Sequence, residues 1–165
     1  MKLAIVPGSF DPMTLGHLDL IQMVAQKYDR VVVAVMQNKE KTYLFSPDER
    51  LQIAKQTILD LKNVSAIFDD GMLIDLYDRL GACAVCKGWR DEKDLVYEES
   101  MAEWNREHNP HFVTELFRAN PVYEDYSSTR VRLVMEQNEE LLGLVHPRAI
   151  PICLKKKKER TVKND

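Results

Sequence analysis

The sequence predicts an α/β protein with a doubly wound, five-stranded parallel sheet and helices on both faces. Short apolar runs rich in β-branched residues alternate along the chain with longer amphipathic or charged segments. The runs are apolar throughout rather than at every second position, which is typical of strands buried on both faces. Each intervening segment is long enough to form the crossover helix that consecutive parallel strands require.

The first part of the chain contains two strand and helix units. Leu3 to Val6 is the first expected strand, and Leu15 to Tyr28 the first helix, with apolar residues repeating on one face. Arg30 to Val35 ("RVVVAV") is the second strand. Ser46 to about Leu61 is the second helix, because it begins with a serine N-cap, a proline at the first helical position and two acidic residues.

Three more strands follow with their helices. Val64 to Phe68 is the third strand, and "GMLIDLYDRLG" is a short helix that ends at Gly81. Ala82 to Cys86 is the fourth strand. Asp91 to Asn109 is a long charged helix, and Phe112 to Phe117 is the fifth strand.

The C-terminal part is expected to be helical. Ser127 or Ser128 can cap a helix that runs to about Gln137, and a further helix is expected near Pro147. Pro151 would fall early inside that last helix, so the helix either begins later or is kinked there.

Composition points to one ordinary globular domain. The chain has 165 residues, of which 45% are hydrophobic and 30% charged, and its net charge is -3. We expect a domain of residues 1–154, followed by a basic, frayed tail of residues 155–165. The net charge gives no general attraction to nucleic acid or anionic membranes, and no apolar run approaches the roughly 20 residues of a membrane span. A cytoplasmic protein is expected.

The three cysteines are expected to be buried free thiols. Cys83 and Cys86 have the Cys-x-x-Cys spacing of redox pairs and of zinc half-sites, but they lie in an apolar run and no second pair accompanies them. Residues three apart on a strand also point to opposite faces.

The segment after the first strand, "PGSFDPMTLGH", is the strongest candidate for a ligand site. It contains neither G-x-G-x-x-G nor G-x-x-x-x-G-K-[ST]. Gly8 permits close approach of the main chain to a ligand, Ser9 offers a hydroxyl, and His17 lies in the first turn of a helix whose free N–H groups attract anions. Each residue alone has a simple structural explanation, whereas their combination at a strand end indicates an anion site. Asp11 is explained as a turn former, not as a metal ligand.

Five motifs in this chain resemble those of the bacterial phosphopantetheine adenylyltransferase family, within the nucleotidyltransferases that share a T/H-x-G-H element. The motifs are "GSFDPMTLGH", "NKEKTYLFSPDER", "CKGWR", "DLVYE" and "YSSTRVR", and they occur in the family order from Pro7 to Arg132. The resemblance implies a Rossmann-like fold, transfer of an adenylyl group from ATP to 4′-phosphopantetheine with Mg²⁺, and a homohexamer.

The resemblance also implies roles for individual residues. His17 would stabilise the transition state, assisted by Lys41 and Lys87. The phosphopantetheine site would comprise Ser9, Lys41, Met72, Leu73 and Lys87. The ATP site would comprise Ser9, Phe10, His17, Gly88, Trp89, Arg90, Glu98, Tyr123, Glu124, Asp125, Tyr126, Ser127, Ser128 and Thr129. No protein ligand is assigned to the metal.

Several of these residues keep a second interpretation. Lys41 lies in a charged surface loop beside Lys39, and Lys87 could extend to water from a strand end. Lys87 also stands where the family usually has arginine, so it would contact phosphate without the planar guanidinium fork. Met72 and Leu73 could equally belong to the core.

The sequence is also compatible with two other functions. The first is another small nucleotidyltransferase, acting on an alcohol phosphate with CTP or on nicotinamide mononucleotide. The usual H-x-G-H form of the motif is absent here, because Thr14 occupies its first position. The second is a nucleotide-binding module without catalysis, against which the retention of Ser9, His17, Lys41 and Arg90 argues.

Overall fold

The computed structural model describes residues 1–137 and 139–164, with side chains up to residue 160. Five parallel strands form one sheet in the order β3-β2-β1-β4-β5, which confirms the predicted α/β class. The strands are β1 (Leu3–Gly8), β2 (Arg30–Met36), β3 (Val64–Asp69), β4 (Ala84–Trp89) and β5 (Thr114–Arg118). The helices are α1 (Leu15–Lys27), α2 (Pro47–Thr57), α3 (Leu73–Leu80), α4 (Glu92–His108), α5 (Ser128–Glu136) and α6 (Ile150–Asn164).

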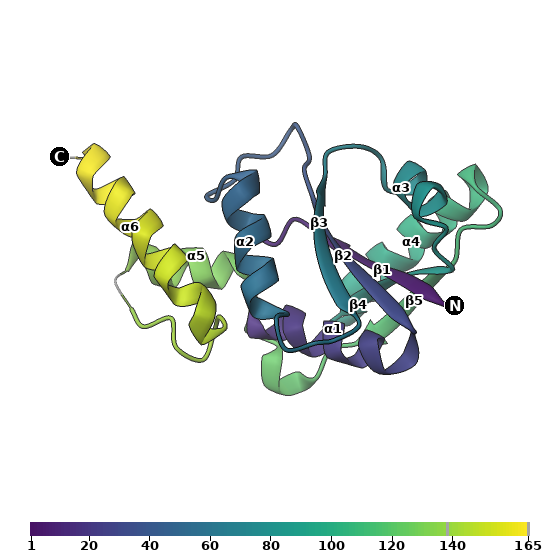
Figure 1. Ribbon diagram of the computed structural model, residues 1–165, viewed down its shortest axis with the longest axis horizontal. Helices are drawn as coiled ribbons and strands as arrows, with labels where there is room; N and C mark the ends of the chain where they lie inside the picture. The colour runs from purple at the N-terminus through teal and green to yellow at the C-terminus, as the bar shows by residue number, and fades with distance from the viewer. Residues whose placement is uncertain (138, 165) are drawn as a thin grey trace.

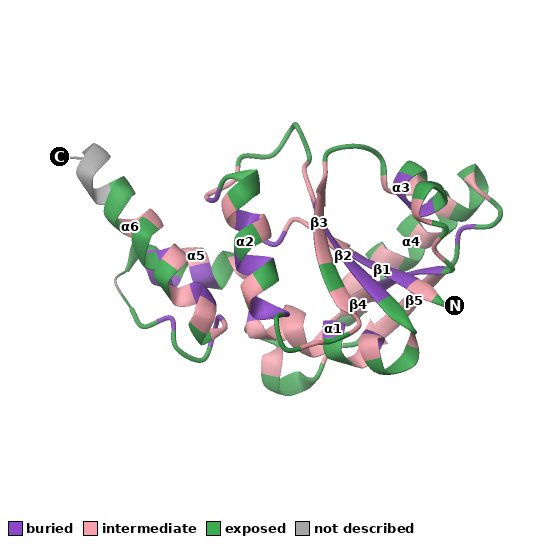
Figure 2. Cartoon of the chain, in the orientation of Figure 1, coloured by how far each residue is buried: buried purple, intermediate pink, exposed green. Residues whose placement is uncertain are grey.

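Alternate strand residues enter two separate cores, one on each face of the sheet. In β1, Ala4 and Val6 pack in the larger core with Ile21 of α1 and Ile53 of α2. Ile5, between them, packs in the smaller core under α3. Figure 1 shows α3 and α4 on the side of the sheet away from α1 and α2, and the buried residues follow the strands and the inner sides of the helices (Figure 2). The doubly wound arrangement is therefore confirmed.

The fourth strand extends further than its apolar run. The expected strand from Ala82 to Cys86 is shifted, because Lys87, Gly88 and Trp89 continue the pairing with β5. Main-chain hydrogen bonds to β5 hold Lys87 and Gly88 in β4, although residues of these two types are uncommon in strands. Lys87 therefore lies within β4, near its carboxyl end, and not in the loop after it.

The boundaries of α2 and β5 also differ from those predicted from the sequence. Helix α2 ends at Thr57 instead of about Leu61, and the Thr57 hydroxyl donates to the Ile53 carbonyl. The fifth strand begins at Thr114, because Phe112 instead packs beside Tyr77 in the smaller core. The end of α2 thus carries a hydrogen bond within its own last turn, whereas the start of β5 depends on a contact with α3.

The C-terminal helices follow their capping residues. Ser127 is the N-cap of α5, since its hydroxyl accepts from the main-chain N–H of Arg130 at 3.0 Å. A short 3₁₀ helix, η2 (Pro147–Ala149), precedes α6, so Pro151 lies in the first turn of α6, where proline is tolerated. This is the later start that Pro151 suggested.

Helix α6 continues past residue 154, where the sequence suggested a frayed tail. Lys156 is only 17% exposed and pairs with Glu49 of α2 at 2.8 Å. Of the expected tail, Asp165 lies outside the described residues.

The prediction that all three cysteines are buried is wrong for one of them. Cys86 and Cys153 are buried, but Cys83 is exposed, because it precedes β4 and does not lie within it. The described part of the chain contains no helix long and apolar enough to cross a membrane.

Candidate active site

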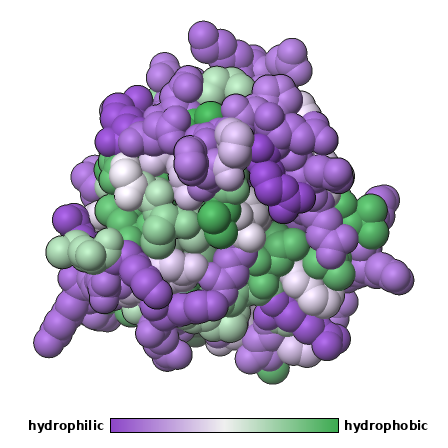
Figure 3. Space-filling model, turned by 90° about the vertical axis from the view of Figure 1, so that its right-hand side faces the viewer, coloured by the Kyte–Doolittle hydropathy of each residue, from purple (hydrophilic) through white to green (hydrophobic). Residues whose placement is uncertain are grey.

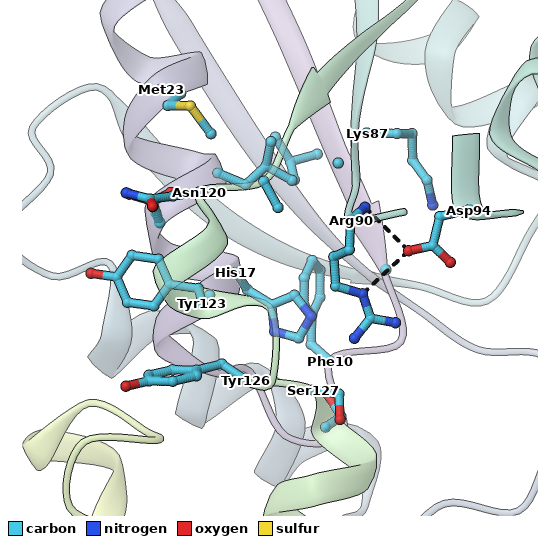
Figure 4. Close-up of a pocket in the computed structure, with 18 of the residues that line it drawn as sticks. Phe10, His17, Met23, Lys87, Arg90, Asp94, Asn120, Tyr123, Tyr126 and Ser127 are labelled. Atoms are coloured by element: carbon cyan, nitrogen blue, oxygen red, sulfur yellow. Dashed lines mark hydrogen bonds and ion pairs between the residues drawn. The ribbon is translucent and has the colours of Figure 1, made fainter. Parts of the chain in front are cut away.

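A cleft of about 320 Å³ opens where the loops after β1 and β4 diverge. The strand order reverses between these neighbouring strands, and ligands of open α/β sheets bind at such points, beyond the carboxyl ends of the strands. Figure 4 shows the side chains that converge there. The lining residues are Val6, Pro7, Gly8, Ser9, Phe10, Gly16, His17, Asp19, Leu20, Met23, Lys87, Gly88, Arg90, Asp94, Glu98, Ala119, Asn120, Tyr123, Tyr126, Ser127 and Ser128.

His17 is held by a capping box at the start of α1. The Thr14 hydroxyl accepts from the main-chain N–H groups of Gly16 and His17, and Nδ1 of His17 accepts from the main-chain N–H of Thr14 at 2.9 Å. Because a main-chain N–H can only donate, Nδ1 must be unprotonated. The neutral imidazole therefore carries its proton on Nε2 and can donate it in a hydrogen bond.

The surroundings of His17 keep it neutral. Burial, together with the nearby positive charges of Lys87 and Arg90, lowers the pKa of its imidazole to about 4. The edge of the ring meets the ring of Phe10, with centroids 5.1 Å apart. His17 is thus a neutral hydrogen-bond donor beside two cations.

Gly8 is required by its neighbour Phe10. A Cβ at Gly8 would stand 2.8 Å from the Phe10 ring, which is closer than packed atoms allow. Phe10 itself has a φ of 46°, a left-handed conformation that is uncommon for a bulky residue. The sequence predicted that a ligand would come close to the Gly8 main chain; in this structure the Phe10 side chain occupies that position.

Two cations and two carboxylates lie side by side on the β4 and α4 side of the cleft. Nζ of Lys87 lies 3.5 Å from a carboxylate oxygen of Glu98, and Nε of Arg90 lies 3.2 Å from a carboxylate oxygen of Asp94. Asp94 and Glu98 are one helical turn apart, so they present to the same side of α4. The cations are therefore held in place before any ligand arrives.

The segment from Tyr123 to Ser128 forms the wall of the cleft opposite β4 and α4. The Thr14 hydroxyl donates to the Tyr126 carbonyl, and the Ser128 hydroxyl donates to the Pro12 carbonyl, both at 2.7 Å. The rings of Tyr123 and Tyr126 meet edge to face at 5.1 Å. These hydroxyls tie the segment to the loop after β1. The Arg130 N–H donates to the Ser127 hydroxyl, so the earlier main-chain N–H groups of α5 and the Ser127 hydroxyl proton can serve a ligand.

The structure gathers many of the predicted site residues at the cleft. These are Ser9, Phe10, His17, Lys87, Gly88, Arg90, Glu98, Tyr123, Tyr126, Ser127 and Ser128. The others do not line it: Lys41, Met72, Leu73, Trp89, Glu124, Asp125 and Thr129.

The residues outside the cleft have other surroundings. Lys41 lies exposed on the loop between β2 and α2, and Met72 is 57% exposed at the N-cap of α3. Leu73 packs against the smaller core, as one of its two interpretations proposed. The Trp89 ring lies under the guanidinium of Arg118, and the Glu124 carbonyl accepts from Arg90.

Sequence reasoning missed several lining residues. Asp19, Leu20 and Met23 follow Gly16 at helical spacing, so they share the face of α1 that reaches the cleft. That spacing could have identified them. Asp94 begins the "DLVYE" motif but received no role. Nothing in the sequence singles out Ala119 and Asn120, which the end of β5 brings to the site.

Comparison with known proteins agrees with this geometry. The chain matches the Cytidylyltransferase-like family over residues 5–134. It is 38% identical over 157 residues to a phosphopantetheine adenylyltransferase of Limosilactobacillus reuteri, covering 95% of this chain and 90% of the relative. The chain belongs to the phosphopantetheine adenylyltransferase family. This confirms the family resemblance and identifies the protein as an enzyme of the nucleotidyltransferase class.

Other members of the family also match most of the chain. The phosphopantetheine adenylyltransferase of Limosilactobacillus fermentum is 36% identical over 168 residues, covering 100% of this chain and 97% of the relative. That of Caldanaerobacter subterraneus is 38% identical over 136 residues, covering 82% and 85%. A crystal structure of a putative nicotinate-nucleotide adenylyltransferase from Vibrio parahaemolyticus superposes with a TM-score of 0.70, covering 97% of this chain and 96% of the other, at 16% identity. That likeness concerns the fold alone.

Proposed function

We propose that the enzyme transfers the adenylyl group of ATP to 4′-phosphopantetheine, forming dephospho-coenzyme A and pyrophosphate. Family membership supports this reaction over cytidylyl transfer or use of nicotinamide mononucleotide. The observation that carries the proposal is His17, a neutral Nε2–H donor at a helix N-terminus beside Lys87 and Arg90.

The chemistry needs positioning and charge stabilisation, not a strong base. A phosphate oxygen of phosphopantetheine forms a bond to the α-phosphorus of ATP, and the bond from that phosphorus to the bridging oxygen of pyrophosphate breaks. The attacking phosphate is already ionised at neutral pH. His17 can donate a hydrogen bond to the charge that develops on the α-phosphate, as preorganised donors do in other transfer reactions.

The cations of the cleft fit the two anionic substrates. Lys87 would face the phosphate of phosphopantetheine, joined by Ser9 and by Lys41 from the neighbouring loop. Arg90 would face the triphosphate of ATP, and the segment from Tyr123 to Thr129 the adenine. The aromatic rings and free N–H groups of that segment support this assignment.

We propose that Mg²⁺ enters with the nucleotide. The described residues contain no group of three or more His, Cys, Asp or Glu side chains arranged to hold a metal. Mg²⁺ usually keeps several waters and binds substrate phosphates with only one or two carboxylates, so a single carboxylate of the cleft such as Glu98 would suffice. Bound there, the ion would neutralise charge on the triphosphate.

We also propose that the enzyme self-associates, with the homohexamer as the assembly that the family resemblance implies. Tyr97, Met101 and Trp104 form an exposed stripe at helical spacing on α4, and that helix has no buried residue in the described chain. On the end of the molecule that carries α3 and α4, apolar side chains gather within a polar rim (Figure 3).

Light scattering of the wild type and of Trp104→Glu tests self-association. A charge in an apolar interface should lower the molar mass of the assembly in solution.

The reaction is tested by pyrophosphate release from three substrate pairs. ATP with phosphopantetheine should release pyrophosphate, whereas CTP with glycerol phosphate and ATP with nicotinamide mononucleotide should not. Turnover with either of the latter pairs alone would replace the proposed reaction. No turnover with any pair would leave a nucleotide-binding module.

A His17→Ala variant separates chemistry from binding. We expect it to lower kcat by at least about a hundredfold while leaving ATP affinity nearly unchanged, because His17 is proposed to act mainly in the transition state. An unchanged kcat would remove His17 from the mechanism.

A further inference from the structure

The ion pair between Arg90 and Asp94 is unusual in where it lies. Both residues line the cleft, and the Asp94 carboxylate accepts from the Nε–H and from the main-chain N–H of Arg90, each at 3.2 Å. One carboxylate oxygen makes both contacts, which folds the arginine side chain back toward its own main chain. Figure 4 shows both contacts at the wall of the cleft.

A second contact fixes the guanidinium group at its other side. Nη1 of Arg90 donates to the Glu124 carbonyl at 3.4 Å. The Asp94 carboxylate thus accepts from Nε of Arg90 and the Glu124 carbonyl accepts from its Nη1. Within the part of the chain that the structure describes, Nη2 of Arg90 has no hydrogen-bond acceptor. Since a guanidinium carries five donors in one plane, two fixed positions set the direction of the remaining ones.

The pair contributes little to the stability of the fold. Its side chains are 44% and 35% exposed, and exposed pairs of this kind stabilise proteins weakly. The start of α4 is capped independently, because the Asp91 carboxylate accepts from the main-chain N–H of Asp94. The geometry of Asp94 is therefore better explained by the orientation of Arg90 than by folding.

We propose that Asp94 is a positioning residue that aims the Arg90 guanidinium at the polyphosphate of the bound nucleotide. This inference rests on the proposed function only in assigning ATP to the cleft. The alternative is that Asp94 simply places a negative charge near the N-terminus of α4, which favours the helix without affecting the ligand.

A double-mutant cycle on the full chain tests the assignment. ATP binding is measured by titration calorimetry with Mg²⁺ and without phosphopantetheine, so no turnover occurs. We expect Asp94→Ala to weaken ATP binding about tenfold, as loss of one charge-assisted contact would. In the Arg90→Ala background the same substitution should have no further effect, because Asp94 acts through Arg90.

Glu92→Ala is the matched control. Glu92 also lies exposed in the first turn of α4, but it does not line the cleft. Its removal should change helix stability as much as the loss of Asp94 does and leave ATP affinity unchanged.

Three outcomes would overturn the assignment: unchanged ATP affinity in Asp94→Ala, equal losses in the wild-type and Arg90→Ala backgrounds, or an equal loss in Glu92→Ala. Failure of the proposed function is distinguishable, since an enzyme that binds ATP without adenylylating phosphopantetheine would still give a clear result in the cycle. A wild type that binds no ATP would overturn both.

Discussion

The properties of His17 come from contacts at the scale of single atoms. Its Nδ1 accepts a main-chain N–H from Thr14, so the tautomer is set by a group that cannot change its own protonation. Burial and two neighbouring cations then disfavour the charged form. A side chain that often serves as an acid or base near neutral pH thereby becomes a permanent donor.

The protonation of His17 provides the first prediction. The imidazole should titrate near pH 4, compared with about 6.5 in an unfolded chain, in an NMR titration of its ring resonances. The folded pKa is lowered, so the unfolded chain takes up its proton first. The contribution of His17 to stability is therefore complete above about pH 6.5 and is lost as the pH falls toward 4. A midpoint near 6.5 in the folded protein would contradict this account.

At the scale of elements, the loop between β2 and α2 is clamped at both ends to the loop after β1. The buried Asp11 carboxylate accepts from the main-chain N–H groups of Leu44 and Phe45, each at 2.9 Å. At the other end, the buried Arg50 guanidinium donates to the carbonyls of Ser9 and Met36. The loop that carries Lys41 is thus anchored on both sides of Phe10, and Asp11 does more than form a turn.

Removing the Asp11 carboxylate should loosen this loop. We expect Asp11→Ala to destabilise the fold by roughly 2 to 4 kcal/mol, because two main-chain N–H groups in a buried region lose their acceptor. Urea unfolding measures the loss, and hydrogen exchange should become faster at the Leu44 and Phe45 amides. Asp48→Ala serves as the control, since Asp48 is exposed. Equal effects of the two substitutions would contradict the clamp.

At the scale of the whole molecule, the C-terminal segment completes the larger core. Cys153 of α6 is fully buried there together with Val145 and Ala149. The main-chain N–H of Leu15 donates to the Leu144 carbonyl at 2.9 Å, so this segment also supports the start of α1 beside the cleft. Residues far apart in the sequence therefore share one packed unit.

Thiol reactivity reports on this packing. Cys83 should react rapidly with a thiol reagent in the native enzyme, because it is exposed. Cys86 and Cys153 should react only on unfolding, since burial raises the pKa of both thiols to about 12. Spectrophotometric counting of modified thiols before and after denaturation checks this, and Cys83→Ala should abolish the rapid phase. Rapid modification of a second thiol would show that the core opens easily.

Local signals determined most of the architecture. The apolar runs, the serine caps of α2 and α5 and Gly81 after α3 are visible in the sequence because strand burial and helix capping depend on residues near in the chain. The motifs from Pro7 to Arg132 likewise carried the family assignment. The end of β4 and the start of β5 were misplaced, since the pairing of β4 with β5 decides the first and the packing of Phe112 beside Tyr77 the second.

The tertiary structure alone decided how the site works. The sequence placed His17 at a helix start and Arg90 after a strand. It could not show the low pKa of His17, which needs the burial of the ring and the charges of Lys87 and Arg90 beside it. Nor could it reveal the ion pair and hydrogen bond between Asp94 and Arg90 within the cleft. Electrostatic and packing effects act through space over a few ångströms, so they become visible only when the chain has brought distant residues together.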